Sequence, residues 1–444
     1  MKRHLPLLLS WSAAPAGASP TQRKNFRNVQ IDAIGVGLAS AAAPFLPVFL
    51  TRLGATNFQV GLLAAMPAVT GLLLAILIGR FLQGRRNVVT WFGFSRLLTI
   101  LCYALTGLVT FFVPEDYLVF SVILIWAAAT IPQTMVNIAF SVVMNAVAGP
   151  EGRYDLMSRR WSILGFTTAI TVALAGQLLD HLWFPLNYQV IFIGLSIGGL
   201  ISFYFSTSLD LPESPSAIEP TPQPMRDRLK GYFRLIRSEP AFVAFTAKQF
   251  VFMAGTSLAI PLFPLYYVRD VQANDTWIGF INMAQTAVVL IGYTFWVRQS
   301  RRRGGRYVLL WTTFCLALHP ALTALTHNLL LIVLYAGLAG IFQAGLNLVF
   351  FDEQMKTFPP QYSATFVSLA QCLQYLAAAA APLLGTLLAG YIGLDGALLV
   401  STGLRFVGFG LFAWDNKNWP RRLRRRRRVT WLTLLRVRRL VRAG

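Results

Sequence analysis

The chain has 444 residues, of which 55% are hydrophobic and 13% are charged, and its formal net charge at neutral pH is +22. Soluble domains carry roughly 25% charged residues, so this composition excludes an ordinary soluble protein and indicates a chain that lies largely in a membrane. Its three cysteines have no spacing typical of a disulfide framework or a metal site, and we expect neither metals nor other cofactors.

Apolar runs follow one another along almost the whole chain. A bilayer core of about 30 Å needs roughly 20 apolar residues in each spanning helix, and the runs meet that length. They are continuously apolar, without the alternation typical of a β-barrel, so we predict an all-α polytopic membrane protein with twelve transmembrane helices. The predicted helices lie near residues 28–50, 58–79, 88–113, 117–147, 161–182, 188–207, 241–267, 276–297, 307–326, 328–351, 362–391 and 395–414.

The basic residues indicate how these helices are oriented. On the twelve-helix prediction all but five of the 39 Lys and Arg residues fall on one side of the membrane. Arg52 and Arg269 fall on the opposite side, and Arg96, Lys248 and Arg405 fall within helices. Because cytoplasmic loops carry the excess of basic residues, we expect both termini to be cytoplasmic, in a bacterial inner or plasma membrane. A cleaved signal peptide at residues 1–25 would invert this arrangement, so we interpret that stretch as a cytoplasmic tail.

Two segments of the chain repeat one pattern. PFLPVFLTRLGATNFQVG begins at Pro44, and PLFPLYYVRDVQANDTWIG begins at Pro261. A shift of 217 places Arg52 on Arg269, and one further residue brings Gly61 onto Gly279. QTMVNIAF and QAGLNLVF, which begin at Gln133 and Gln343, match at a shift of 210.

The repeat predicts two six-helix bundles with the same orientation, related by an axis along the membrane normal. The Pro-rich and charged stretch between them is typical of a flexible linker that joins two bodies. The expected parts are an N-terminal tail (1–25), an N-terminal bundle (26–207), a linker (208–240), a C-terminal bundle (241–415) and an Arg-rich cytoplasmic tail (416–444). Two bundles around one central site are the architecture of alternating access.

These features resemble the major facilitator superfamily over residues 25–415. GRFLQGRRN, from Gly79 to Asn87, is similar to the basic loop that this family carries between its second and third helices, although Gln83 stands where the family has an aspartate. The loop that contains Arg153 resembles the family's short basic loop between helices four and five. The resemblance implies a cytoplasmic gate with five loop residues in it: Gly79, Gly84, Arg85, Arg86 and Arg153. The alternative is that the arginines contact lipid headgroups or helix C-termini.

In this family the first helix of each triplet lines the central cavity, so the resemblance points to helices one, four, seven and ten. Much of the unusual polarity of the sequence lies on these helices, and the spacing i to i+4 places each Gln and Asn pair on one helix face. The candidate residues for a substrate cavity and for coupling are Asp32, Gln133, Asn137, Lys248, Gln249, Gln343 and Asn347. For each amide the alternative is a plain interhelical hydrogen bond.

Asp32 and Lys248 need partners, because a charge within a spanning helix costs roughly 2.5–3.5 kcal/mol on insertion scales. Asp32 corresponds to Gln249 at a shift of 217, so our first hypothesis is an ion pair between Asp32 and Lys248. Asp32 is also the best candidate for a proton carrier. The alternative is that Asp32 caps the positive end of its helix. His319 precedes Pro320, and we interpret it as a partner for a carbonyl that the proline frees.

Enzyme motifs are absent from the sequence, and GRFLQGRR lacks the Lys and Ser/Thr of a nucleotide-binding loop. We therefore expect a secondary active transporter for a small solute, proton-coupled and working by rocker-switch alternating access, and no enzyme. The alternative is a non-transporting relative that acts as a lipid scramblase, sensor or assembly partner. The basic residues within helices favour an anionic or amphipathic solute. We expect the Arg-rich tail to bind anionic lipids and no nucleic acid, and we expect a monomer.

Overall fold

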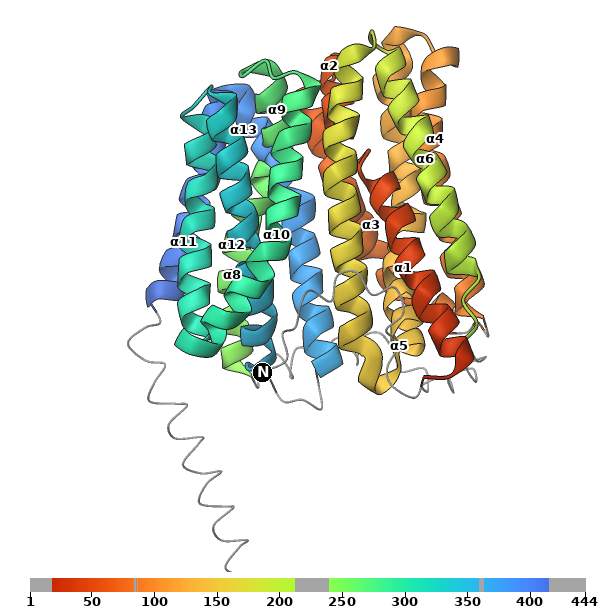
Figure 1. Cartoon of the computed structure of the whole chain (residues 1–444). Coiled ribbons are helices and arrows are strands. Elements are labelled where there is room, and N and C mark those ends of the chain that lie inside the picture. Colours follow the sequence, from red (N-terminus) through yellow and green to blue (C-terminus); the bar gives the residue numbers. More distant parts are fainter. Residues whose placement is uncertain (1–17, 84, 86, 212–238, 359–362, 415–444) are drawn as a thin grey trace, which may run out of the picture.

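The computed structural model describes residues 18–211 and 239–414, apart from 84, 86 and 359–362. Every regular element in this part of the chain is a helix, and Figure 1 shows the helices standing side by side. The elements are α1 (Pro20–Ser40), α2 (Phe45–Arg52), α3 (Asn57–Gln83), α4 (Val88–Phe112), α5 (Glu115–His181), α6 (Leu186–Thr207), α8 (Pro240–Ala259), α9 (Leu262–Arg269), α10 (Asp275–Arg303), α11 (Gly305–Ala324), α12 (Leu329–Met355) and α13 (Ser363–Trp414).

Eleven candidate membrane spans lie in the described residues. The long helix α5 contributes two of them, Glu115–Ala148 and Leu156–His181. The last, Phe366–Trp414, has 49 residues, more than twice the ~20 that one crossing needs. Gly393 interrupts it with a φ of 80°, at the break predicted between the last two helices. Two crossings in α13 make the predicted twelve, and the all-α fold is confirmed.

The predicted first and seventh helices are each broken into two pieces. α1 and α2 are separated by a turn over residues 41–44, and α8 and α9 by Ile260 and Pro261. Pro44 and Pro261 cap the short helices α2 and α9, because proline has no N–H to continue the preceding helix. The second proline of each motif, Pro47 or Pro264, lies in the first turn of its short helix, where backbone N–H groups have no intrahelical acceptor. The repeated P-x-x-P therefore builds the same break twice.

The N-terminal boundary differs from the expected tail of residues 1–25. α1 begins at Pro20, where the Ser19 side chain accepts a hydrogen bond from the Gln22 amide at 3.1 Å. Ser at an N-cap followed by Pro is a favourable helix start, but residues 20–27 are polar, so hydropathy alone does not predict it. The helix thus reaches past the apolar run on which the prediction rested.

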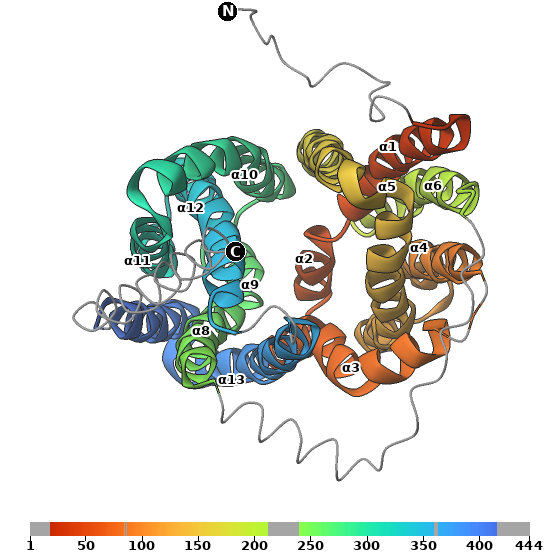
Figure 2. The same ribbon diagram turned by 90° about the horizontal axis from the view of Figure 1, so that it is seen from below.

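The helices form two bundles, α1–α6 and α8–α13, which Figure 2 shows side by side with α2 and α9 at the boundary. At the end of the molecule that contains Arg52 and Arg269, which we call the Arg52 end, one apolar core spans both bundles. It includes Phe49 and Tyr188 from the first bundle and Leu262 from the second. Each bundle also has a core of its own, which includes Val143 in the first and Val349 in the second. The two bundles therefore share packed interior at the Arg52 end.

Candidate functional site

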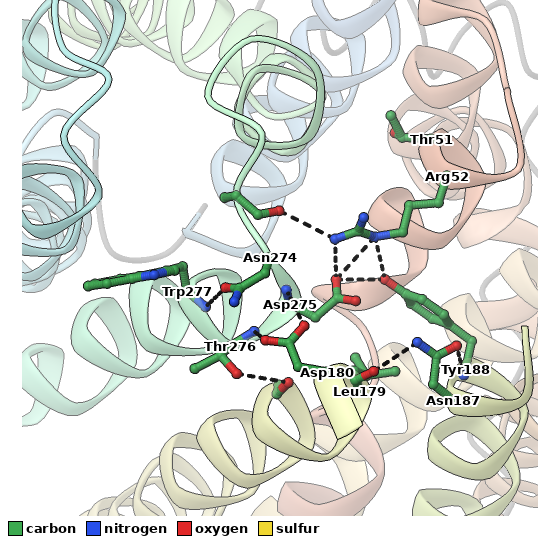
Figure 3. Close-up of polar contacts among 12 residues, drawn as sticks. Thr51, Arg52, Leu179, Asp180, Asn187, Tyr188, Asn274, Asp275, Thr276 and Trp277 are labelled. Atoms are coloured by element: carbon green, nitrogen blue, oxygen red, sulfur yellow. Dashed lines mark hydrogen bonds and ion pairs between the residues drawn. The ribbon is translucent and has the colours of Figure 1, made fainter. Parts of the chain in front are cut away.

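Two polar sites stand out in the described structure: a contact between the bundles at the Arg52 end, and a buried charge cluster around Asp32 inside the first bundle. The contact between the bundles is built on the repeated motif. Arg52 ends α2, and its guanidinium reaches the second bundle, where Nη2 lies 2.9 Å from Asp275 Oδ1 and donates to the Ala273 carbonyl at 3.3 Å. Figure 3 shows these contacts, with the Tyr188 hydroxyl beside both Arg52 and the Asp275 carboxylate. The Tyr188 hydroxyl donates to Asp275 Oδ1 at 2.8 Å.

Arg269, which corresponds to Arg52 in the repeat, makes the reciprocal contact. Its guanidinium donates to Asn57 Oδ1 at 2.5 Å and to the Ala55 carbonyl, both in the first bundle. At the shift of 218 that aligns the end of the motif, Ala55 corresponds to Ala273 and Asn57 to Asp275. Each arginine therefore binds the loop and helix start that follow the other arginine.

The helix start at α10 also receives a cap from the opposite bundle. Asp180, near the end of α5, accepts hydrogen bonds from the backbone N–H groups of Asp275 and Thr276, both at 3.0 Å. A carboxylate is favourable there because the first N–H groups of a helix are unpaired and its dipole is positive at that end. α3 has no such cap from the second bundle, since Thr56 and Gln59 cap it locally.

Glycines let the backbones of the two bundles approach each other. A Cβ on Gly176 of α5 would lie 2.6 Å from the Asp275 carbonyl oxygen and 3.0 Å from the Gly279 Cα. Gly61 of α3, which corresponds to Gly279 in the repeat, packs against Thr386 of α13, where a Cβ would lie 2.4 Å from the threonine Oγ1. Between residues whose side chains the structure describes, the hydrogen bonds and ion pairs that join the bundles all belong to this end.

Asp32 lies inside the first bundle and is 2% exposed. Its Oδ1 accepts from Arg96 Nη1 of α4 and from Ser202 Oγ of α6, the latter at 2.6 Å. Its Oδ2 lies 3.4 Å from Arg160 Nη2 of α5. Four helical segments thus meet at one carboxylate, which neither partial solvation nor a helix terminus stabilises.

The expected pair between Asp32 and Lys248 is not what the structure shows. The ion pairs that the structure describes for Asp32 are with Arg96 and Arg160, two arginines of the same bundle. The interpretation as a helix cap is wrong too, because Asp32 lies in the thirteenth position of α1. Lys248 is half-buried on α8.

Arg160 is a site residue that the sequence analysis missed. The sequence predicts a loop there, with the next span beginning at residue 161, but α5 is helical over the whole of Glu115–His181 and Arg160 is 3% exposed within it. Its guanidinium stacks on the Phe140 ring at 4.5 Å, and its Nε has no partner. One feature of the sequence could have indicated its burial: Arg160 lies directly at the edge of an apolar run, and helices often extend further than such a run.

The predicted cavity amides lie on α5, α8 and α12. Gln133 is half-buried and Asn137 exposed on α5. Gln343 donates to Asn347 Oδ1 at 2.8 Å, which confirms that this pair shares one face of α12. Asn347 also donates to the Tyr293 hydroxyl of α10 at 3.3 Å. The substrate role of these residues stays a prediction.

Gln249 of α8 occupies the place in the second bundle that Asp32 has in the first. It is 3% exposed, and its Oε1 has no partner. The acid that the first bundle buries is therefore replaced by an amide in the second.

The predicted gate loop is described in part. Arg85 is exposed and stacks over the Phe81 ring at 4.3 Å, so its described contacts are aromatic. A Cβ on Gly79 would meet nothing within 4 Å. Gly84, Arg86 and the side chain of Arg153 lie outside the described residues. The role of the loop as a gate stays a prediction.

Comparison with known proteins identifies the family. The family model described as "Major Facilitator Superfamily" matches residues 33–254 and 248–443. The chain belongs to the major facilitator superfamily. This confirms the resemblance seen in the sequence, together with the two-bundle fold of a membrane transporter.

Solved structures of transporters share this fold. The nucleoside transporter NupG matches with a TM-score of 0.64 at 13% identity, covering 90% of this chain and 100% of that one. A bacterial homologue of the iron transporter ferroportin, in its inward-facing state, gives 0.65 at 14% identity, with 90% and 100% covered. A bacterial homologue of the human lysosomal transporter Spinster gives 0.64 at 12% identity, with 89% and 97% covered. No curated protein matches the chain.

Proposed function

We propose that this superfamily member is a secondary active transporter that moves a small solute by alternating access. The observation that carries the proposal is the reciprocal binding of Arg52 and Arg269 across the two bundles. These contacts join the bundles at one end by polar groups and helix termini, and opening there would also separate the apolar core that both bundles share. A gate that opens and closes needs an interface whose contacts can form and separate.

The basic residues give the gate its side of the membrane. If the positively charged loops are cytoplasmic, the Arg52 end faces away from the cytoplasm. The structure then corresponds to a state closed on the outer side, and transport would require the Arg52–Asp275 and Arg269–Asn57 contacts to separate.

Asp32 is the residue that we propose for proton coupling. It is a carboxylate held between Arg96 and Arg160, so a proton on Asp32 would release both guanidinium groups. Arg160 stacks on Phe140, which lies on the same stripe of α5 as Gln133 and Asn137. Protonation would thus free a positive charge beside the predicted substrate-lining face, which favours an anionic solute.

The test begins with a thermal-shift screen of the purified protein against anions, sugars, amino acids and drugs at two pH values. A ligand that binds the native state raises the apparent stability by mass action. The ligands found are then tested for uptake into proteoliposomes with an imposed pH gradient. We expect gradient-driven accumulation of an anion by the wild type and none by Asp32→Asn.

Two results would contradict the proposal in different ways. Uptake that is equal with and without the gradient would remove proton coupling and leave facilitated transport. Binding without flux, or no ligand in any class, would favour the alternative of a non-transporting protein that acts as a lipid scramblase, sensor or assembly partner.

A further inference from the structure

A small cavity lies at the end of the second bundle that is opposite the Arg52 end. α10, α11 and α12 surround it, and Figure 2 shows these three helices next to one another. Its volume is about 200 Å³, which is room for a small molecule but not for a further helix. If the positively charged loops are cytoplasmic, this is the cytoplasmic end of the bundle. The lining combines apolar side chains with two charged residues, Arg301 and Asp352.

The floor of the cavity is the apolar core of the second bundle. Trp296, Val308 and Val349 line the cavity and belong to that core, and none of them is more than 3% exposed. The indole N–H of Trp296 donates to the Ile341 carbonyl at 2.8 Å, which holds the ring in place. Because its one polar atom is satisfied there, Trp296 contributes carbon surface to the cavity. An apolar floor of this kind is typical of ligand sites, where it binds the apolar part of a molecule.

The two charged residues of the cavity differ in their partners. Asp352 Oδ2 lies 2.6 Å from Lys356 Nζ, so the lysine balances its charge. Among the residues that the structure describes, Arg301 forms no ion pair, and its side chain is exposed. Ser300, the residue before it, adds a hydroxyl to the lining. The cavity therefore has one guanidinium and one hydroxyl available to a negatively charged group.

The start of α11 also engages the neighbouring carboxylates. α11 begins at Gly305, and its N-cap Gly304 has no side chain to cap it. A Cβ on Gly305 would lie 2.6 Å from Glu353 Oε1 and 3.5 Å from Asp352 Oδ2. Both carboxylates thus lie at a helix start, where the first N–H groups are unpaired and the dipole is positive. The acids at this end have a lysine and a helix terminus as partners, and Arg301 is left for an anion from outside the chain.

Basic residues are in excess beside the cavity. The last turn of α10 contains Arg301, Arg302 and Arg303, all of them exposed. The negative end of a helix dipole is equivalent to about half an elementary charge, so three cations exceed what it balances. The general excess of basic residues on the cytoplasmic side accounts for such a run, but it does not account for an apolar cavity beside it. Charge and shape together favour a ligand with an anionic group and an apolar body.

We propose that this cavity binds a small amphipathic anion, a phosphate or carboxylate group attached to an apolar body. The anionic group accepts hydrogen bonds from the Arg301 guanidinium and the Ser300 hydroxyl, and the apolar body lies on Trp296. Two sources share this chemistry: a free cytoplasmic solute, and an anionic phospholipid, since basic pockets between helices on the cytoplasmic side bind lipid headgroups. Binding here requires no transport, so the proposal stands or fails separately from the proposed function.

The first experiment measures the Tm of the purified protein with hexyl phosphate, inorganic phosphate or hexylamine at constant ionic strength. We expect hexyl phosphate to raise the Tm saturably by ~2 °C, since it binds the folded state. Inorganic phosphate should bind more weakly because it lacks the apolar body, and hexylamine should give no saturable rise. Arg301→Gln should raise the half-saturating concentration about tenfold, the effect of one lost hydrogen bond to a charged group. Arg302→Gln, the same change at the neighbouring exposed arginine, should leave it unchanged.

A second variant fills the cavity from its wall. Val297 lines the cavity, so Val297→Phe should abolish the response to hexyl phosphate, whereas Thr294→Phe, at an exposed position of α10 outside the lining, should keep it. A crystal with 6-bromohexyl phosphate should show a bromine anomalous peak against Trp296. A response that survives Val297→Phe, equal responses to hexyl phosphate and hexylamine, no saturable response in the wild type, or a bromine peak elsewhere would each overturn the proposal.

Native mass spectrometry separates the two sources of the anion. If the ligand is a lipid, the wild type incubated with phosphatidylglycerol retains more of it than Arg301→Gln does, and hexyl phosphate displaces the difference. If the ligand is a free solute, both proteins retain equal amounts of lipid while hexyl phosphate still raises the Tm of the wild type. Retention that depends equally on Arg301 and Arg302 would show a general charge effect and would overturn the lipid source.

Discussion

Arg52 and Arg269 occupy equivalent positions in the two halves of the chain, and each binds the loop that follows the other. Arg52 donates to the Ala273 carbonyl and pairs with Asp275, and Arg269 donates to the Ala55 carbonyl and to Asn57. The pseudo-symmetry is imperfect at the helix start that each arginine binds, where Asp275 in one half corresponds to Asn57 in the other. The Arg52 contact is consequently an ion pair and the Arg269 contact a neutral-acceptor hydrogen bond.

This difference predicts unequal effects of removing the two arginines. Arg52→Gln should open the Arg52 end more than Arg269→Gln, because it leaves Asp275, which is 4% exposed, without its cation. We expect a shift of ~1–3 kcal/mol in the closed-to-open equilibrium for Arg52→Gln. Spin labels at Phe58 of α3 and Trp277 of α10 would report the longer distance by pulsed electron resonance. Lys24→Gln breaks an exposed ion pair with Asp210 and should leave the distances unchanged.

A double-mutant cycle tests whether Arg52 and Asp275 act as a pair. Asp275→Asn alone should open the gate about as much as Arg52→Gln, and the two together should be less than additive because each already removes the same interaction. Tyr188→Phe removes one hydrogen bond to Asp275 and should have a smaller effect, ~1 kcal/mol. Strictly additive effects of Arg52→Gln and Asp275→Asn would show that the contact does not hold the gate.

A larger side chain at Gly176 should block closure of the Arg52 end sterically. Gly176→Val puts side-chain atoms where the Asp275 carbonyl and the Gly279 backbone lie, so α5 and α10 cannot approach as they do here. We expect the open population to dominate in the same distance measurement and transport to fall sharply. Gly194→Ala of α6 is the matched control, since a Cβ there meets nothing and alanine favours the helix. Normal closure in Gly176→Val would show that the closed state does not require the close approach of α5 and α10 at Gly176.

The Asp32 cluster predicts a large loss of stability. Asp32→Asn leaves Arg96 and Arg160 buried without a carboxylate, and breaking a buried pair in this way costs about 3–5 kcal/mol. The Tm of the purified protein should fall accordingly, and the additional change Arg160→Met should recover part of the loss. Lys248→Ala should add its effect independently of Asp32→Asn. A non-additive effect of these two changes would revive the pair expected from the sequence.

Asp270 gives a pH prediction at the Arg52 end, in the loop between α9 and α10. Burial raises the pKa of Asp270, as does the charge of Asp395, while His327 and Arg269 oppose the shift. The folded state therefore binds this proton more tightly than the unfolded chain, so stability is highest below the unfolded pKa of ~3.9 and falls as pH rises above it. Asp270→Asn should flatten this part of the Tm-against-pH curve. An unchanged slope would show that Asp270 does not contribute to it.

The sequence determined the fold of this protein because length, hydropathy and repetition are properties of the chain itself. Apolar runs of bilayer length set the number of crossings, and Gly393 fell at the predicted break between the last two. The repeat at Pro44 and Pro261 predicted two equivalent halves, and its arginines stood out as the basic residues placed on the opposite side of the membrane.

Only the tertiary structure decided which charges meet. Asp32 was expected to bind Lys248, but Arg96 and Arg160 approach it on neighbouring helices, and helix rotation within a bundle is not written in hydropathy. Arg160 was hidden at the edge of an apolar run, because the sequence does not show how far a helix continues beyond its apolar residues. Arg405 of α13 donates a hydrogen bond to the Leu316 carbonyl of α11, which Pro320 leaves without its usual helical donor. Such pairings depend on the packing of whole helices, whereas the number of helices depends on each segment alone.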